Sequence, residues 1–469
     1  MATAISDLAS ETKLNMKSAK MKLLMEKFVV GIGVLATLSF ANISAVSAQT
    51  SNVNLQGRYL TVISDGDFFA STYADGRIPG ADSRYRDALT IIPLPLTGTT
   101  ISLEVSNAVT SAPETLVLAP DGNTAFVVEY QGQRPIGATT RNDLPPGRWL
   151  TMIDLKNPTQ PQILDRIEVG PSPEAIDVHP SGNWLAIATD SSTNAPDGAS
   201  EVLQLIPINQ SALGEPINIS LESLGIPTAP GALNASYVEW HPSGRYLAVN
   251  LYRQNRIVLL EFTQNAASGE ASLKLWGTPV SVDTDPYSGR FTPDGRHYIT
   301  ANWKRNFEAT SLEGRLPNQP STVSVIQLGD RDQAHRVITT VASDQSSEGI
   351  AVSPDGTLVA TANMRDTALP TSSPRFTREA TVSLFSLNAD SGALTKVGDF
   401  VFEGVLPEGI TFDATGEHLV VATFAYLNSS EPMGGLDIWR IDREPRLGLQ
   451  YTGRINVPPG AHQVIVAPQ

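Results

Sequence analysis

Short runs of β-branched and small apolar residues recur along the chain, separated by turn residues. The clearest set lies in residues 347–387, where three such runs follow one another and the turn Pro354-Asp355-Gly356 separates the first two. Runs of this length, bounded by proline and glycine, are typical of antiparallel strands rather than helices. The pattern therefore predicts a chain built mainly from short strands.

The same unit repeats along the chain at a nearly constant spacing. The turn glycine recurs at intervals of 60, 62, 51, 61 and 60 residues. Its copies are Gly122, Gly182, Gly244, Gly295, Gly356 and the degenerate Gly416. Such regularity indicates one supersecondary unit used many times, each copy burying its faces against its neighbours.

A seventh repeat is divided between the two ends of the chain. Gly57–Val62 matches the second run of a repeat but has no first run before it, whereas Pro459–Gln469 matches a first run and then stops. Joining the two pieces would remove the open sheet edge that otherwise invites aggregation. We therefore predict an all-β, seven-bladed β-propeller with four-stranded antiparallel blades, in which the N- and C-terminal strands close the last blade.

The repeat motifs also resemble a known family. Pro-Glu-Gly, an apolar strand, Pro-Asp-Gly and Ala-Asn precede Thr-Val-Ser-Val-Ile (Thr322–Ile326) or Thr-Val-Ser-Leu-Phe (Thr381–Phe385). This order resembles the YVTN-repeat and lactonase-like propellers, a group that includes phosphogluconolactonase. The resemblance implies the propeller fold and a lactonase-like activity. Its motifs describe blades, and fold alone does not define function.

The first 48 residues have the layout of a secretory signal peptide. Four lysines (Lys17, Lys20, Lys22 and Lys27) precede the apolar run Phe28–Ala41, and Val46-Ser47-Ala48 supplies small residues for cleavage. The run is short for a bilayer span, although an uncleaved anchor is the alternative. We expect residues 1–48 to be removed, residues 49–469 to form one propeller domain, and the protein to be periplasmic or secreted with no remaining membrane span.

Charge and cysteine content narrow the classes of partner. Without residues 1–48, the chain holds 28 of its 33 basic and 45 of its 48 acidic residues, a net charge of −17. Such an acidic surface disfavours nucleic acid, whose binding depends on basic contacts to phosphate. The absence of cysteine excludes disulfides, thiol catalysis and cysteine metal sites. We expect a monomer.

The period near 60 exceeds the 40 to 50 residues of common propeller repeats. The additional residues lie mainly in the connection after the second strand, at residues 65–87, 130–148, 190–200, 303–321, 364–379 and 424–435, and only the connection at 251–256 is tight. Alternate connections of a meander fall on one face, so these loops share a face with the start of each first strand. Insertions gathered on one face often mark a binding surface.

Aligning the first strands on their turns places one residue of each blade at the channel mouth on this loop face. The seven residues are Glu114, Glu174, Ser236, Tyr287, Glu348, Glu408 and His462. Clustered carboxylates can hold a divalent cation such as Ca²⁺ or Mg²⁺, or raise one another's pKa for acid–base catalysis. We select Glu174, Glu348, Glu408 and His462 as catalytic candidates and Glu114 as a ligand contact. The alternatives are that the glutamates cap backbone N–H groups and that His462 is a chance substitution at a repeat position.

Arginines are concentrated in the same loops. Fourteen of the 28 basic residues lie in or beside these connections, and 13 of the 14 are arginine. Arginine recognises carboxylate and phosphate through two parallel hydrogen bonds. We expect an anion to contact Arg134, Arg148, Arg305, Arg365 and Arg378. The alternative is solvated charge paired with acids of the same loops.

Two functions remain open. The first is an exported lactonase-like hydrolase acting on a small anionic lactone or sugar acid. The second is a non-enzymatic scaffold or binding protein of the cell envelope. A closed pocket where glutamate and arginine converge would favour hydrolysis. A flat surface with exposed aromatic residues, such as Trp303, Phe307, Phe424 and Tyr426, would favour a protein partner.

Overall fold

The computed structural model describes residues 53–80, 85–96, 98–107, 114–189, 201–226, 235–265, 269–329 and 334–469. All of them belong to one compact unit, residues 41–469. The expected signal peptide and the insertion at 190–200 lie outside the described residues. In the described ranges, no helix is both long enough and apolar enough to span a membrane.

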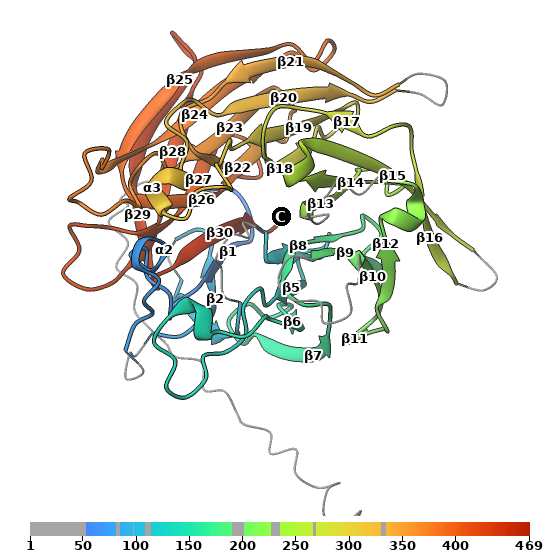
Figure 1. Ribbon diagram of the computed structural model, residues 1–469, viewed down its shortest axis with the longest axis horizontal. Coiled ribbons are helices and arrows are strands. Elements are labelled where there is room, and N and C mark those ends of the chain that lie inside the picture. The colour runs from blue at the N-terminus through green and yellow to red at the C-terminus, as the bar shows by residue number, and fades with distance from the viewer. Residues whose placement is uncertain are drawn as a thin grey trace, which may run out of the picture. The chain divides into compact units, whose positions relative to one another are not determined.

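Seven antiparallel sheets form the blades of a ring around a central channel (Figure 1). Blade 1 comprises β4 (Leu116–Leu118), β5 (Thr124–Val128), β6 (Trp149–Asp154) and β7 (Gln162–Glu168). Blade 2 comprises β8 (Pro173–Val178), β9 (Trp184–Thr189), β10 (Glu201–Asn209), β11 (Ala212–Leu213) and β12 (Ile217–Ser220). Blade 3 comprises β13 (Ala235–Trp240), β14 (Tyr246–Leu251), β15 (Arg256–Gln264), β16 (Ala271–Leu275) and β17 (Val280–Ser281). Blade 4 comprises β18 (Pro286–Phe291), β19 (His297–Asn302), β20 (Thr322–Gln327) and β21 (Arg336–Ala342).

Three further blades complete the ring. Blade 5 comprises β22 (Ser347–Val352), β23 (Leu358–Asn363), β24 (Glu379–Leu387) and β25 (Leu394–Glu403). Blade 6 comprises β26 (Val405–Phe412), β27 (His418–Ala425), β28 (Gly434–Asp442) and β29 (Gly448–Val457). Blade 7 comprises β30 (Ala461–Val466), β1 (Tyr59–Ser64), β2 (Ala88–Pro93) and β3 (Ile101–Glu104). Short helices lie in the connections: α2 (Thr72–Asp75), α3 (Leu312–Arg315) and the 3-10 segments η1 (Arg141–Asp143), η2 (Glu222–Leu224) and η3 (Tyr252–Gln254). The predicted seven-bladed propeller is confirmed.

The two ends of the described chain pair in blade 7, as predicted. β30 is the innermost strand and runs antiparallel to β1, with Val464 opposite Val62. The Arg58 side chain then reaches the turn of blade 1, where Nη2 lies 3.0 Å from the Asn123 side-chain oxygen. Blade 7 thus joins the beginning of the chain to its end and leaves no gap in the ring.

The repeated turns join neighbouring blades. His179 and His241 each precede a turn proline, and their Nε2 atoms lie 2.8 Å from the carbonyl oxygens of Gly244 and Gly295, the turn glycines of the next blade. Gly244 has a positive φ of 71°, and a Cβ there would lie 2.5 Å from the His179 ring. Only glycine meets both requirements, which explains the constant turn glycine at this contact.

Candidate functional site

In six of the seven blades, the first strand is bulged at the ring position that the sequence alignment predicts. In blade 2, Pro173 pairs with Thr189 and Ala175 with Ala188, so two residues of β8 face one of β9. The same slip occurs in five other blades, at Ser236, Tyr287, Glu348, Glu408 and His462. A bulge re-aims a side chain, and here it lets the ring residue and the residue three positions later both face the channel.

The backbone turns sharply just before each bulge. The residue two positions ahead of the ring residue is left-handed in five blades: Ser172 (φ 50°), Asp285 (63°), Ser346 (59°), Leu406 (52°) and Gly460 (83°). This conformation is unfavourable for residues other than glycine. The fold therefore carries backbone strain at the point where it delivers the ring residues.

A pocket of about 100 Å³ opens on the loop face. Two adjacent ring residues, Glu348 and Glu408, line it together with Arg141, Arg305 and Arg315. Its remaining walls come from the connections and from Leu406 of β26; the connection residues are Tyr73, Trp303, Thr310, Ser311, Leu312, Leu316, Met364 and Ala368. The described structure thus brings acids of the ring and arginines of the loops into one enclosure.

The two glutamates are buried, and one carboxyl oxygen of each has no hydrogen-bond donor within the described ranges. Glu348 is 2% exposed and Glu408 1%, and the Oε2 atom of each accepts no hydrogen bond from the described residues. Burial raises the pKa of Glu348 to about 8, although the charge of Arg305 opposes the shift. Burial also raises the pKa of Glu408, and the charges of Glu348 and Asp65 add to the effect. Both acids therefore hold their protons to higher pH than an ordinary carboxyl group.

Glycine after the ring residue permits this close arrangement. A Cβ at Gly349 would lie 2.0 Å from the carbonyl oxygen of Glu408. A larger residue would push blades 5 and 6 apart at the level of the pocket. The repeated Glu-Gly pair therefore reflects packing around the channel.

Arg305 is fixed beside Glu348 by a buried ion pair. Its Nε and Nη2 lie 2.8 and 2.9 Å from the two carboxylate oxygens of Asp285, whose side chain is fully buried. The guanidinium also lies 4.1 Å from the centre of the Trp303 ring and 4.2 Å from that of Tyr287. Burial alone would lower the pKa of Arg305, but the charge and hydrogen bonds of Asp285 raise it. Nη1 has no hydrogen bond to the described residues and belongs to a side chain that lines the pocket.

Three further arginines lie near the pocket mouth. Burial lowers the pKa of Arg315, and the like charges of Arg141, Arg305 and Arg253 lower it further. Arg315 Nε is buried and has no hydrogen-bond partner among the described residues. Within the described residues, none of Arg141, Arg253 and Arg315 forms an ion pair with an acidic side chain. Uncompensated positive charge of this kind favours an anionic ligand.

The other ring residues lie elsewhere. Glu114 lines a separate cavity on the turn face, where it pairs with Arg290. Glu174 is 2% exposed and close enough to Tyr287 for its charge to raise the pKa of that phenol, after the larger effect of burial. His462 is fully buried, with Nδ1 3.0 Å from the Gly460 carbonyl oxygen and Nε2 3.2 Å from the Thr115 hydroxyl. Burial lowers the pKa of His462 to about 4, so the ring is neutral at physiological pH.

The arginines selected from the sequence are dispersed, apart from Arg305. Arg134 donates to the carbonyl oxygens of Pro79 and Ala138, so it joins its own connection, 130–148, to the connection at 65–87. Arg148 is exposed. Arg365 lies 3.7 Å from both Asp344 and Glu379, and the exposed Arg378 lies 3.9 Å from Glu403. None of these four lines the pocket that contains Glu348 and Glu408.

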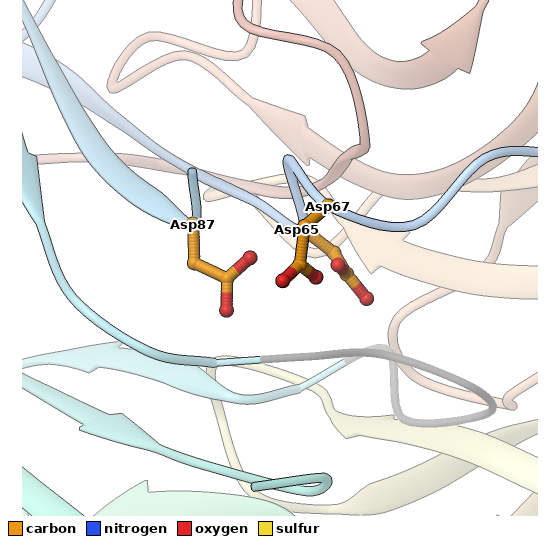
Figure 2. A group of neighbouring side chains, drawn as sticks. All are labelled: Asp65, Asp67 and Asp87. Atoms are coloured by element: carbon orange, nitrogen blue, oxygen red, sulfur yellow. The ribbon is translucent and has the colours of Figure 1, made fainter. Parts of the chain in front are cut away.

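A candidate cation site lies beside the ring and is formed by other residues. In the part of the chain that the structure describes, one group of three acidic or histidine side chains places ligand atoms within 4.8 Å of one another: Asp65, Asp67 and Asp87 (Figure 2). Two of its oxygens accept backbone hydrogen bonds, since Asp87 receives the N–H groups of Gly66 and Asn107 at 3.1 and 3.2 Å. The described ring residues form no such group of three.

Residue type and spacing alone did not distinguish the pocket arginines. Arg141 and Arg315 were two of the 14 basic residues near the loops, and only the loop conformation brings them to Glu348. Asp285 and Tyr73 had no sequence signal, because neither occupies the aligned ring position. Three of the four aromatic residues proposed as a flat surface are instead covered, since Trp303 is 5% exposed, Phe424 1% and Tyr426 8%, whereas Phe307 is half-buried.

Fold and site together define a seven-bladed propeller with an acid–arginine pocket at one mouth of its channel. The family model described as lactonase, 7-bladed beta-propeller matches residues 83–425. The chain belongs to this lactonase family of seven-bladed propellers. No curated protein sequence matches it.

Solved structures of low sequence identity share the fold. A candidate 6-phosphogluconolactonase from Bacteroides fragilis superposes with a TM-score of 0.59 at 18% identity, covering 87% of this chain and 98% of its own. One from Bacteroides uniformis gives 0.59 at 16% identity, with 88% and 99% covered. The periplasmic gluconolactonase of Pseudomonas aeruginosa gives 0.56 at 17% identity, with 87% and 100% covered. At these identities the likeness concerns the fold.

Proposed function

We propose that this protein hydrolyses a small lactone that carries a negative charge, and that the reaction takes place in the loop-face pocket. One observation carries the proposal: the pocket joins two buried carboxyl groups of raised pKa to Arg141 and Arg315, which have no acidic partner among the residues that the structure describes. Membership of the lactonase family supports the reaction type. The covered aromatic residues give no support to the alternative of a broad protein-binding surface.

The two glutamates supply complementary proton transfers. Opening a lactone requires a base that removes a proton from water as its oxygen attacks the carbonyl carbon, and an acid that protonates the departing ring oxygen. Glu348 is the better base, because Arg305 opposes the rise of its pKa. Burial and the charges of Glu348 and Asp65 raise the pKa of Glu408, so this group keeps its proton and serves as the acid. The carbon–oxygen bond of the ring breaks, a hydroxycarboxylate leaves, and solvent restores both groups.

The arginines divide the remaining tasks. Arg305 is held rigidly by Asp285, so its Nη1 is placed to stabilise the negative oxygen that develops on the lactone carbonyl. Arg141 and Arg315 are placed to bind the anionic group of the substrate at the mouth. This division keeps the substrate charge away from Glu348 and Glu408.

The test is a hydrolysis screen with neutral, carboxylate-bearing and phosphate-bearing lactones, in which the release of protons measures the rate of hydrolysis. We expect the wild type to prefer charged lactones, Glu408→Gln to lose most of kcat, and the double variant Arg141→Gln/Arg315→Gln to raise KM for charged substrates only. Arg378→Gln is the matched control, because it removes an exposed loop arginine outside the pocket. A wild type that hydrolyses no lactone would reject the proposal and leave the cell-envelope scaffold as the better function.

We also propose that the protein acts in the periplasm or outside the cell after cleavage near Ala48. The lysine-rich, apolar and small-residue segments of residues 1–48 support this location. The periplasmic location of the Pseudomonas aeruginosa relative is consistent with it. N-terminal sequencing of protein from the cell-envelope fraction tests the cleavage; an intact Met1 in the cytoplasm would reject it.

A further inference from the structure

A second cavity occupies the opposite end of the channel. It has a volume of about 340 Å³ and is framed by the repeated turns, including Pro293 and Pro354. All seven innermost strands contribute to its wall. This volume falls in the range of small-molecule sites, and the cavity shares no lining residue with the loop-face pocket.

Acidic and uncharged residues line different sides of this turn-face cavity. The residues three positions beyond the bulges form its central ring: Val117, Asp177, Glu239, Arg290, Ala351, Thr411 and Ile465. Asp177 and Glu239 come from the adjacent blades 2 and 3, and Glu114 of the loop-face ring reaches the same side. The wall contributed by β22, β26 and β30 carries no titratable side chain. An occupant would therefore meet acidic groups on one side and uncharged, mostly apolar groups on the other.

Two acidic groups of the cavity have no basic partner within the described residues. The one basic group in its wall, Arg290, already pairs with Glu114 and also donates to the Gly289 carbonyl oxygen at 2.9 Å. Asp177 and Glu239 form no ion pair across the described ranges. Each accepts a backbone N–H of the next blade, from Trp240 at 2.6 Å and from Phe291 at 2.9 Å. These hydrogen bonds orient the carboxylates but supply no positive charge.

We propose that the turn-face cavity binds a small organic cation, an ammonium or guanidinium group attached to a short apolar chain. The cationic group would lie between Asp177 and Glu239, with the chain against Ala351, Thr411 and Ile465. A single metal ion fits less well, because no three acidic groups of this cavity bring oxygen atoms within 4.8 Å of one another. A larger cation can contact carboxylates that are further apart. This inference is independent of the proposed lactonase reaction.

The pKa values of Asp177 and Glu239 predict that the affinity of the cavity for a cation depends on pH. Burial raises the pKa of Asp177 to about 7, although two backbone hydrogen bonds and Arg290 oppose the shift, and burial also raises the pKa of Glu239. The other charged groups that face them are Glu114 and Arg290. A cation prefers the ionised carboxylates, so its affinity should fall as the pH drops from 8 to 6.

The probe is n-butylguanidinium, titrated by calorimetry at pH 8 and low salt, with n-butylurea as its uncharged counterpart of the same shape. We expect the wild type to bind one butylguanidinium and to bind butylurea at least tenfold more weakly. Glu239→Gln should weaken binding of the cation about tenfold, because glutamine keeps the hydrogen-bond acceptor and loses the charge. Glu417→Gln, an exposed change of the same charge near the turn at Gly416, should have no effect.

A second variant is included so that a folding defect in Glu239→Gln does not decide the result. Ala351→Leu enlarges a side chain of the apolar wall without altering charge and should weaken butylguanidinium binding by a similar factor; its melting temperature is measured alongside, because Ala351 is 5% exposed and also packs in the core. The proposal is overturned if the wild type does not bind butylguanidinium at millimolar concentration, if butylurea binds equally well, or if neither Glu239→Gln nor Ala351→Leu weakens binding. Lactone hydrolysis is measured separately, so its loss or presence does not decide this result.

Discussion

Replacing Glu348 with glutamine should stabilise the fold while removing lactone hydrolysis. The Glu348 side chain is almost fully buried, and burial raises its pKa to about 8 from an ordinary value of 4.5. Because the folded pKa lies above the unfolded one, the unfolded chain releases its proton first. The free energy of unfolding therefore decreases as the pH rises from 4.5 to about 8.

The magnitude follows from the separation of the two pKa values. At pH 7 the unfolded carboxyl group is ionised and the folded one is still largely protonated, which costs the native state about 3 kcal/mol at roughly 1.4 kcal/mol per pH unit. Glutamine has no such penalty and nearly the same shape. For a domain of this size, about 3 kcal/mol corresponds to a rise of roughly 4 °C in melting temperature.

The assay compares urea and thermal unfolding of wild type and Glu348→Gln at pH 4.5, 6, 7 and 8. The gain in stability should be near zero at pH 4.5 and grow toward pH 8. Glu417→Gln, an exposed acid, is the control and should show no such trend. A variant that is less stable than the wild type at pH 7 would refute the reasoning and support the alternative that Glu348 caps backbone N–H groups.

Three other changes test how the site is built. Ser346→Gly should raise the free energy of unfolding by about 0.5–1 kcal/mol, because glycine tolerates the left-handed backbone; an equal gain from Ser346→Ala in the same urea titration would contradict this cause. Asp285→Asn should destabilise the fold by about 3–5 kcal/mol, since it leaves Arg305 buried without its partner; an unchanged urea midpoint would contradict it. Deleting residues 461–469 removes β30 and exposes strand edges in blade 7, so light scattering should report aggregation, and a monomer with unchanged melting temperature would argue against closure.

The architecture could be predicted from sequence because its information is local and repeated. Each turn glycine marks a contact with the preceding blade, as Gly244 does against His179, so the constant spacing of the glycines follows directly from the geometry of the ring. The split of blade 7 was visible because β30 resembles the other first strands. The β-bulges were not predicted, since a bulge leaves no mark in a pattern of apolar residues.

The site could be predicted only as far as the repeat extends. Alignment identified Glu348 and Glu408, because their position is set by β22 and β26. It placed Glu114 with them, but the salt bridge to Arg290 holds Glu114 in the turn-face cavity. Loop residues have no periodic position, so the paths that bring Arg141 to the pocket depend on tertiary contacts that the repeat does not encode.

The β-bulge that directs Glu348 into the pocket also lowers the stability of the native state. At Glu348 it follows a left-handed residue, Ser346, and directs a carboxyl group into an enclosure where burial resists ionisation. A purely structural role would favour a side chain that is apolar or fully hydrogen-bonded at this position. Glu348 is polar, and its buried Oε2 atom has no hydrogen-bond partner in the described structure. Strain and unmet polar groups that coincide at one place are best explained by an occupant or a reaction that uses them. The repeated unit therefore supplies both the stable ring and, where two glutamates adjoin, the unstable feature on which the proposed chemistry depends.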